Sequence, residues 1–108
     1  MGQYHKVYNI DKKEYFRADF LKLAEQVGTK TSTTALFMLV ANSNGRGGGD
    51  FRDHELIGTW AGDRIVVQGD YAEQGDRGFI SDEEIETYKN ISDKVWEMVD
   101  AGLEGYIS

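Results

Sequence analysis

An uninterrupted apolar run constrains this fold more than any other feature of the sequence. It extends from Ala35 to Ala41, reads ALFMLVA and is the longest apolar run among the 108 residues. A transmembrane helix needs about 20 apolar residues, so this run is far too short to cross a bilayer. A segment that is apolar on every side is instead expected inside a folded domain, as the central element of its core.

Periodicity cannot decide between helix and strand here, because every position of the run is apolar. Four hydroxyl residues precede it, from Thr31 to Thr34, and a hydroxyl side chain is a common cap at the start of a helix. The run also contains two alanines, two leucines and a methionine, which all have high helix propensity. We therefore expect a helix at this position.

The size and composition of the chain fit one globular domain spanning residues 1–108. Hydrophobic residues make up 40% and charged residues 29%, which is ordinary for such a domain. There is no cysteine, which excludes disulfides, thiolate metal sites and cysteine nucleophiles. The sequence contains no pattern typical of a signal peptide or a membrane span, so we expect no membrane partner and a cytoplasmic location.

The N-terminal part predicts a strand followed by a helix. Loose alternation of apolar side chains indicates a strand from Gln3 to Ile10, and the polar residues 11–14 suit a turn. Asp19 can cap a helix that runs through Val27, after which Gly28 is suited to the C-terminal cap. The apolar residues of this helix recur at the spacing of one face, namely Phe20, Leu23, Ala24 and Val27.

Helices are also predicted at the C-terminal end. Ser81 and Glu84 have the spacing of a capping box, which predicts a short helix to about Lys89. Ser92 opens a further helix, with Val95, Trp96 and Val99 facing inward, and Gly102 ends it. Taken together, the pattern predicts an α+β fold in which a short antiparallel β-sheet packs against three or four helices.

A glycine-rich loop, GRGGGD, occupies residues 45–50 and is expected to be mobile. A phosphate-binding loop would need a lysine after its glycines, and a dinucleotide-binding loop would need a glycine where Asp50 stands. Neither nucleotide motif is present. The loop is therefore either a flexible connector or a binding loop, in which Arg46 contacts an anion and Asp50 accepts a hydrogen bond.

A β-hairpin is predicted after this loop, with strands over residues 55–60 and 64–71 and a turn at residues 61–63. Asp63 and Arg64, at its turn, either anchor an interface beside the aromatic side chain of Trp60 or form an ion pair that stabilises the turn. With the glycine-loop residues, they complete the candidate set for binding a partner or ligand: Arg46, Asp50, Trp60, Asp63, Arg64, Asp70 and Tyr71.

The spacing Asp50-x-x-Asp53-His54 has the residue types of a divalent-metal site. It follows a flexible loop, however, and the only other histidine is His5, which is distant in the sequence. We therefore interpret the cluster as a solvated turn and predict neither a metal nor a cofactor. Two histidines without a suitable spacing context do not define a catalytic triad, so no catalytic residue is assigned and a non-enzymatic role is favoured.

Charge is distributed unevenly along the chain, whose net charge is −7. Residues 1–49 carry seven basic and four acidic groups, whereas residues 50–108 carry five basic and fifteen acidic groups. Direct binding of nucleic acid is not expected of the acidic half, because affinity for phosphate comes mainly from lysine and arginine. The excess acid either provides solubility or docks on a basic protein surface. The candidate docking face consists of Asp82, Glu83, Glu84 and Glu86.

Several short motifs are spread over most of the chain. They are MGQY at residues 1–4, NIDKKEY at 9–15, GRGGGD at 45–50, WAGDRI at 60–65, GDY at 69–71 and the segment from Tyr88 to Val95. In these motifs the chain resembles a group of small phage, prophage and bacterial proteins without an assigned function. The resemblance implies a phage or mobile-element setting and brings no established activity. It also marks the glycine loop and the hairpin turn as a functional surface.

Two functions fit these observations. The first, which we favour, is a small acidic phage-type protein that acts without catalysis by binding and inhibiting or adapting a host or defence protein. An anti-CRISPR-like inhibitor is one version, and its partner would offer a basic surface. The second is a small nucleotide- or anion-binding or hydrolytic domain, which would use the glycine-rich loop and the Asp/Arg hairpin turn.

Overall fold

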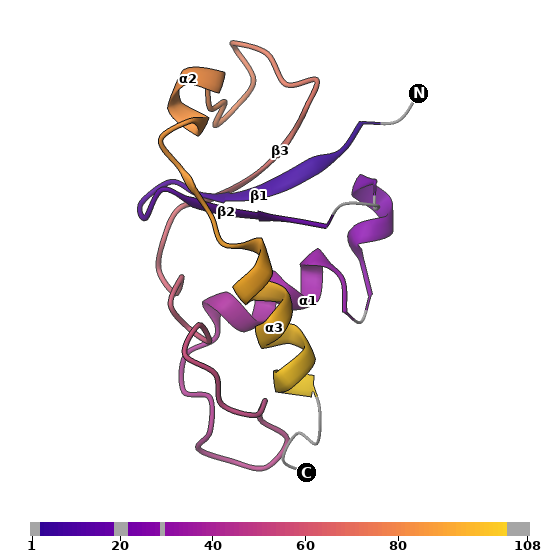
Figure 1. Ribbon diagram of the computed structural model, residues 1–108, viewed down its shortest axis with the longest axis vertical. Coiled ribbons are helices and arrows are strands. Elements are labelled where there is room, and N and C mark those ends of the chain that lie inside the picture. The colour runs from indigo at the N-terminus through magenta and orange to yellow at the C-terminus, as the bar shows by residue number, and fades with distance from the viewer. Residues whose placement is uncertain (1–2, 19–21, 29, 104–108) are drawn as a thin grey trace.

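The computed structural model describes residues 3–18, 22–28 and 30–103 (Figure 1). Within these residues, four strands form one sheet, accompanied by three α-helices and a short 3-10 helix. In chain order the elements are β1 (His5–Asn9), β2 (Glu14–Arg17), the 3-10 helix η1 (Leu23–Gln26), α1 (Ser32–Val40), β3 (Ile65–Gly69), α2 (Asp82–Ile85), β4 (Lys89–Asn90) and α3 (Ser92–Leu103).

The sheet has the strand order β3-β1-β2-β4 and is mixed. β1 pairs antiparallel with both of its neighbours, so that Val7 lies opposite Phe16 of β2 and Val67 of β3. β4 is two residues long and runs parallel to β2. The α+β class is therefore confirmed and the helix number agrees roughly, but the expectation of a purely antiparallel sheet is wrong at the β4 edge.

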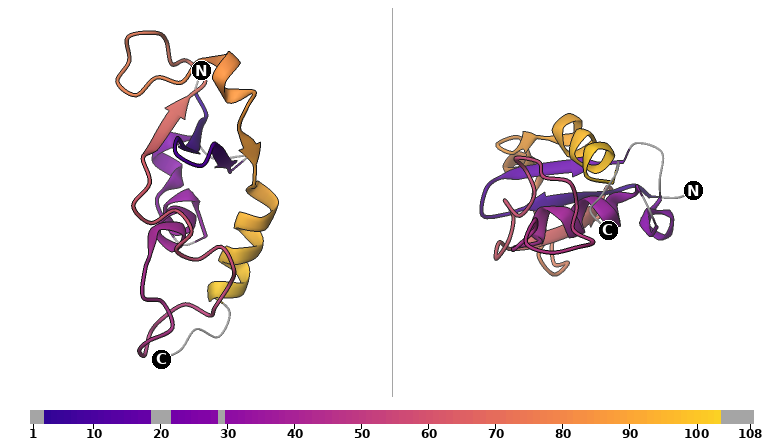
Figure 2. Two further views of the ribbon diagram at one scale, coloured as in Figure 1. Left: turned by 90° about the vertical axis from the view of Figure 1, so that its left-hand side faces the viewer. Right: turned by 90° about the horizontal axis from the view of Figure 1, so that it is seen from below.

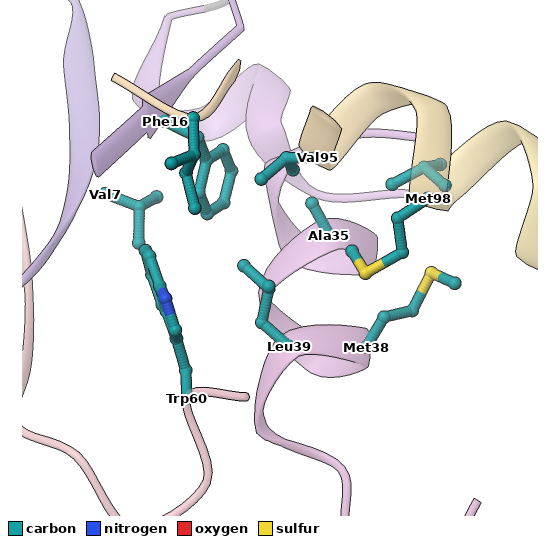
Figure 3. Packing of buried hydrophobic residues seen from close by; sticks show 10 residues of the cluster. Val7, Phe16, Ala35, Met38, Leu39, Trp60, Val95 and Met98 are labelled. Atoms are coloured by element: carbon teal, nitrogen blue, oxygen red, sulfur yellow. The ribbon is translucent and has the colours of Figure 1, made fainter. Parts of the chain in front are cut away.

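The main core lies between one face of the sheet and the two longer helices, α1 and α3 (Figure 2). Figure 3 shows α1, α3 and two strands all contributing side chains to it, with Trp60 closing one side. The predicted helix around the apolar run is confirmed as α1. It is not buried on every side, however, because Met38 and Leu39 are fully buried whereas Phe37 is 65% exposed.

The other face of the sheet carries a second, smaller core. Strand alternation directs Val7 toward the helices and Tyr8 to the opposite face, where Ile80 and Tyr88 pack against it. The segment that follows β3 is attached to this face through Gln68, whose side-chain amide both donates to the Ile80 carbonyl and accepts from the Ile80 N–H, each at 2.8 Å. Residues 70–88 therefore cover one face at one end of the sheet.

The predicted hairpin is wrong, because residues 55–60 form a series of turns and not a strand. The N–H groups of Gly58 and Trp60 donate to the carbonyls of Met38 and Leu39 at the end of α1, at 3.0 and 2.9 Å. Gly58 has φ +81°, and a Cβ at this position would lie 2.7 Å from the Ala41 carbonyl oxygen. Close approach to α1 therefore determines the path of this segment, whereas the second predicted strand is confirmed as β3.

The N-terminal elements differ from the prediction after β1. Residues 10–13 form the turn, and β2 follows it where no strand was predicted. The predicted helix through Val27 is reduced to η1, and the apolar stripe is not buried, since Leu23 is 52% and Val27 75% exposed. The predicted cap Asp19 and the stripe residue Phe20 lie outside the described residues.

At the C-terminal end, α2 is shorter than predicted and ends at Ile85. Its predicted cap is present, because the Ser81 hydroxyl accepts a hydrogen bond from the Glu84 N–H at 3.2 Å. α3 forms as predicted, with Val95 and Val99 buried. Among the described residues, no helix is both long enough and apolar enough to cross a membrane.

Candidate functional site

The glycine-rich loop is closed on its own aspartate. One carboxylate oxygen of Asp50 accepts hydrogen bonds from the N–H groups of Gly45, Arg46 and Gly47 at 2.8, 2.9 and 3.0 Å. These bonds, with those from Gly47 and Gly45 strongest, hold the pKa of Asp50 below its ordinary value of 3.8. The backbone donors that an external anion would need are therefore engaged by the chain itself.

Two further hydrogen bonds join the ends of the same loop. Asn44 accepts a hydrogen bond from the Phe51 N–H at 2.9 Å and donates one to the Phe51 carbonyl at 3.1 Å. The loop was predicted as a mobile connector or a binding loop, and these bonds give it a defined closed conformation. Arg46 remains exposed on it.

Two of the predicted interface residues are bonded to the β1–β2 hairpin. Trp60 is fully buried, and its indole N–H donates to a Glu14 carboxylate oxygen at 2.8 Å. Asp63 accepts from the side-chain amide of Asn9 at 2.9 Å and pairs with the Lys12 ammonium at 3.0 Å. The bonds from Asn9 and then Lys12 lower the pKa of Asp63.

Arg64 is bonded to the same β1–β2 hairpin, through Asp11. Both its backbone N–H and its guanidinium donate to the Asp11 carboxylate, at 2.8 to 2.9 Å, and the backbone bond contributes most to lowering the pKa of Asp11. Asp63 and Arg64 thus form ion pairs with Lys12 and Asp11 of the β1–β2 turn. They do not stabilise the turn of the predicted hairpin, because that hairpin does not form. The NIDKKEY and WAGDRI motifs are therefore in direct contact.

Acidic residues gather at one end of the molecule. The segment from Asp70 to Glu86 contains seven acidic residues and only one basic residue, Arg77, which gives a net charge of −6. All eight charged side chains belong to exposed residues. The segment forms the loop after β3 and α2, at the top of Figure 1, so nearly all of the chain's net charge of −7 is presented there. The predicted acidic face, Asp82, Glu83, Glu84 and Glu86, belongs to this acidic end.

Two residues predicted for separate sites, Asp70 and Asp82, line the same cavity, whose volume is about 180 Å³. Tyr4, Tyr8 and Phe79 contribute aromatic side chains to its lining. Sequence reasoning missed these three residues as site residues. The period-2 alternation of the strand predicted from Gln3 to Ile10 was the available signal, because it places Tyr4 and Tyr8 on one face.

Tyr8 is 4% exposed, although its side chain lines this cavity. Burial, followed by the proximity of Tyr15 and Asp82, raises the pKa of the Tyr8 hydroxyl. Tyr88, in the same small core, differs because its hydroxyl donates to Glu84 at 3.1 Å; burial and this bond raise its pKa to about 12. The Tyr8 hydroxyl forms no hydrogen bond within the part of the chain that the structure describes.

Tyr71 lies beside the cavity and not in it. It is 60% exposed and lines an adjoining cavity of about 230 Å³, together with His5 and Arg77. Its N–H donates to the side-chain carbonyl of Gln3 at 3.2 Å. Of the seven candidates for partner or ligand binding, Asp70 and Tyr71 thus belong to the acidic end.

The Asp50-x-x-Asp53-His54 cluster does not converge on one point. His54 accepts from the Leu56 N–H through Nδ1 at 3.1 Å and contacts a Glu97 carboxylate oxygen through Nε2 at 3.0 Å. Asp50 faces the glycine loop instead. Across residues 3–18, 22–28 and 30–103, no three His, Asp or Glu side chains are grouped so as to hold a metal ion.

Comparison with protein-family models, with curated proteins and with solved structures gives no match to this chain.

Proposed function

We propose that this chain acts without catalysis and binds a basic surface of a partner protein through its acidic end, residues 70–86. The observation that carries the proposal is the exposed net charge of −6 within these seventeen residues, which fold as one end of the molecule. Such a concentrated field accelerates encounter with a surface of opposite charge and selects against acidic partners. In the phage setting that the resemblance implies, the partner is a host or defence protein.

A basic nucleic-acid channel is one surface whose charge is opposite to that of this end. An acidic protein end can occupy such a channel by charge complementarity and so prevent nucleic acid from entering it. The anti-CRISPR-like version of the proposal corresponds to this case. Inhibition would follow from occupancy alone and would require no chemistry from the chain.

The alternative of a nucleotide- or anion-binding domain receives less support. Its residues Asp50, Asp63 and Arg64 are bonded within the chain, to the glycine loop and to the β1–β2 turn. Thermal unfolding with ATP or GTP and Mg²⁺ tests this alternative, because a ligand that binds only the folded state must raise the Tm. A saturable increase in Tm would favour it over the acidic-end proposal.

A charge-reversal pair of variants tests the proposal itself. The first variant is Glu73→Lys, Glu83→Lys and Glu86→Lys, which leaves out Glu84 because that carboxylate accepts the Tyr88 hydrogen bond. The matched control is Asp53→Lys, Asp93→Lys and Asp100→Lys, which makes the same charge change at exposed residues outside the acidic end.

Each tagged protein is used to capture partners from a bacterial host lysate at low and at high salt. We expect a discrete partner for the wild type and the control, weakened at high salt, and its loss for the acidic-end variant. Equal capture by both triple variants would contradict the proposal, as would binding that is insensitive to salt.

A further inference from the structure

A cavity lies between the acidic end and strand β1. Its walls come from β1, from the end of β3 and from the segment leading into α2. We call it the tyrosine cavity and define it by five of its lining residues: Tyr4, Tyr8, Asp70, Phe79 and Asp82. It combines two carboxylates with three aromatic rings.

The Tyr8 hydroxyl is the polar group of this cavity that is open to accept a hydrogen bond. Tyr8 is 4% exposed, and its hydroxyl has no hydrogen bond to any described residue. Asp82 lines the same cavity, so a donor bound there is offered both this hydroxyl oxygen and a carboxylate.

The charges of the cavity favour a cation. Asp70 and Asp82 line it, and no positive charge of the acidic end does so, because Arg77 lines the adjoining cavity instead. Lys6 is the one basic residue in the lining, and its ammonium lies 5.9 Å from the ring centroid of Tyr15 on β2. With Asp70 and Asp82, the lining therefore keeps a net charge of −1.

The size and shape of the cavity distinguish between cations. Its volume of about 180 Å³ is slightly larger than a protein cavity of about 150 Å³ that holds a benzene molecule. A planar guanidinium fits such a space, stacks on aromatic rings and presents five N–H donors to oxygen acceptors. A lysine ammonium offers three donors and no plane to stack.

We propose that the tyrosine cavity receives an arginine side chain of the partner protein. This inference rests on the proposed function, since it names the group of the basic partner that the acidic end recognises. The guanidinium would donate to Asp70, to Asp82 and to the Tyr8 hydroxyl oxygen, and would lie against the ring of Tyr4 or Phe79. Arginine is among the side chains that most often dominate protein interfaces.

Amide chemical-shift mapping of the full chain with small probes tests this directly. N-acetyl-arginine amide is titrated against the ¹⁵N-labelled protein, with N-acetyl-citrulline amide as an uncharged probe of the same shape and N-acetyl-lysine amide as a non-planar cation. We expect saturable shifts around Tyr8, Asp70 and Phe79 for the arginine probe, weaker ones for lysine and none for citrulline.

Two conservative variants locate the binding groups. Tyr8→Phe removes only the hydroxyl, and Asp82→Asn removes only one charge; each is expected to raise the Kd of the arginine probe at least about fivefold, as loss of a hydrogen bond to a charged group predicts. Glu83→Gln is the control, because it removes one charge from the neighbouring exposed position, and its Kd should change less than twofold. Retained spectral dispersion shows that each variant folds.

The inference is overturned if citrulline shifts the same amides as arginine, or if the Tyr8→Phe and Asp82→Asn variants bind the probe as the wild type does. Its failure is distinct from that of the proposed function. Loss of partner capture in the acidic-end triple variant, without any specific arginine binding, would leave the function standing and reject the cavity. Specific arginine binding to the cavity, with partner capture unchanged in the acidic-end triple variant, would leave the cavity standing and reject the proposed function.

Discussion

Replacing Gly58 with alanine should destabilise the fold far more than the same change at Gly62. Both glycines have positive φ, +81° and +82°, so a side chain at either position meets a similar conformational penalty. The penalty for a non-glycine residue in this region is about 1–2 kcal/mol. The two positions differ in their surroundings, because a Cβ on Gly58 lies 2.7 Å from the Ala41 carbonyl oxygen and a Cβ on Gly62 meets no atom within 4 Å.

The close contact at Gly58 is with backbone, which cannot rotate away as a flexible side chain can. The segment must move from the end of α1, which weakens the two hydrogen bonds that Gly58 and Trp60 donate there. Each such bond contributes about 1 kcal/mol, so Gly58→Ala should cost about 3–4 kcal/mol in total and Gly62→Ala about 1–2 kcal/mol.

Urea unfolding at 25 °C, followed by tryptophan fluorescence and circular dichroism, measures both values. The comparison holds if the two variants keep the wild-type m-value, so that the midpoint shift reports stability. Equal destabilisation of the two variants would show that residues 55–60 do not lie against α1 as described, and would refute the reasoning.

Three further outcomes follow from the contacts. Trp60→Phe should lower the free energy of unfolding by about 1.5–3 kcal/mol through loss of the hydrogen bond to Glu14, and a double-mutant cycle with Glu14→Ala should give a positive coupling energy; zero coupling would contradict the bond. Because folding lowers the pKa of Asp50, its stabilising effect is present above pH 3.8 and is lost as pH falls through the lower folded pKa. Acid titration of stability should therefore be shallower for Asp50→Asn than for the wild type, and identical profiles would speak against the closed loop. Tyr8→Phe should change the free energy of unfolding by less than about 0.5 kcal/mol, since the hydroxyl has no hydrogen bond to lose among the described residues. A marked loss of stability would indicate a partner for that group within the chain.

Elements with a strong local signal were predictable from the sequence. The helix formers of the apolar run predict α1, and the Ser92-to-Gly102 pattern predicts α3. The expected hydroxyl cap of α1 is wrong, because the N-cap residue Thr31 makes no side-chain capping bond. β2 was missed because four residues next to a turn carry too little pattern to separate from the turn. Residues 55–60 have strand composition, but Gly58 and the carbonyls of α1 determine their conformation through contacts distant in the sequence.

The candidate site was predictable by residue type and not by arrangement. The acidic residues of α2 follow from composition, and their exposure agrees with a docking face. Their proximity to Asp70 depends on the path of the loop after β3, which Gln68 directs by binding the Ile80 backbone. For Asp63 and Arg64, the sequence left open whether they contact a partner or form an ion pair. Their partners, Lys12 and Asp11, lie about fifty residues away and were visible only in the fold.

Amide hydrogen exchange on the captured complex is the most direct test of the proposal that the acidic end binds a basic partner. The exchange rates of the free chain are compared with those of the chain bound to the partner that the wild type captures. We predict that binding slows exchange across residues 70–86 and the adjoining strand β1, and leaves the glycine loop at residues 45–50 unchanged. Protection confined to the glycine loop or to α3, with residues 70–86 exchanging as in the free chain, would contradict the account.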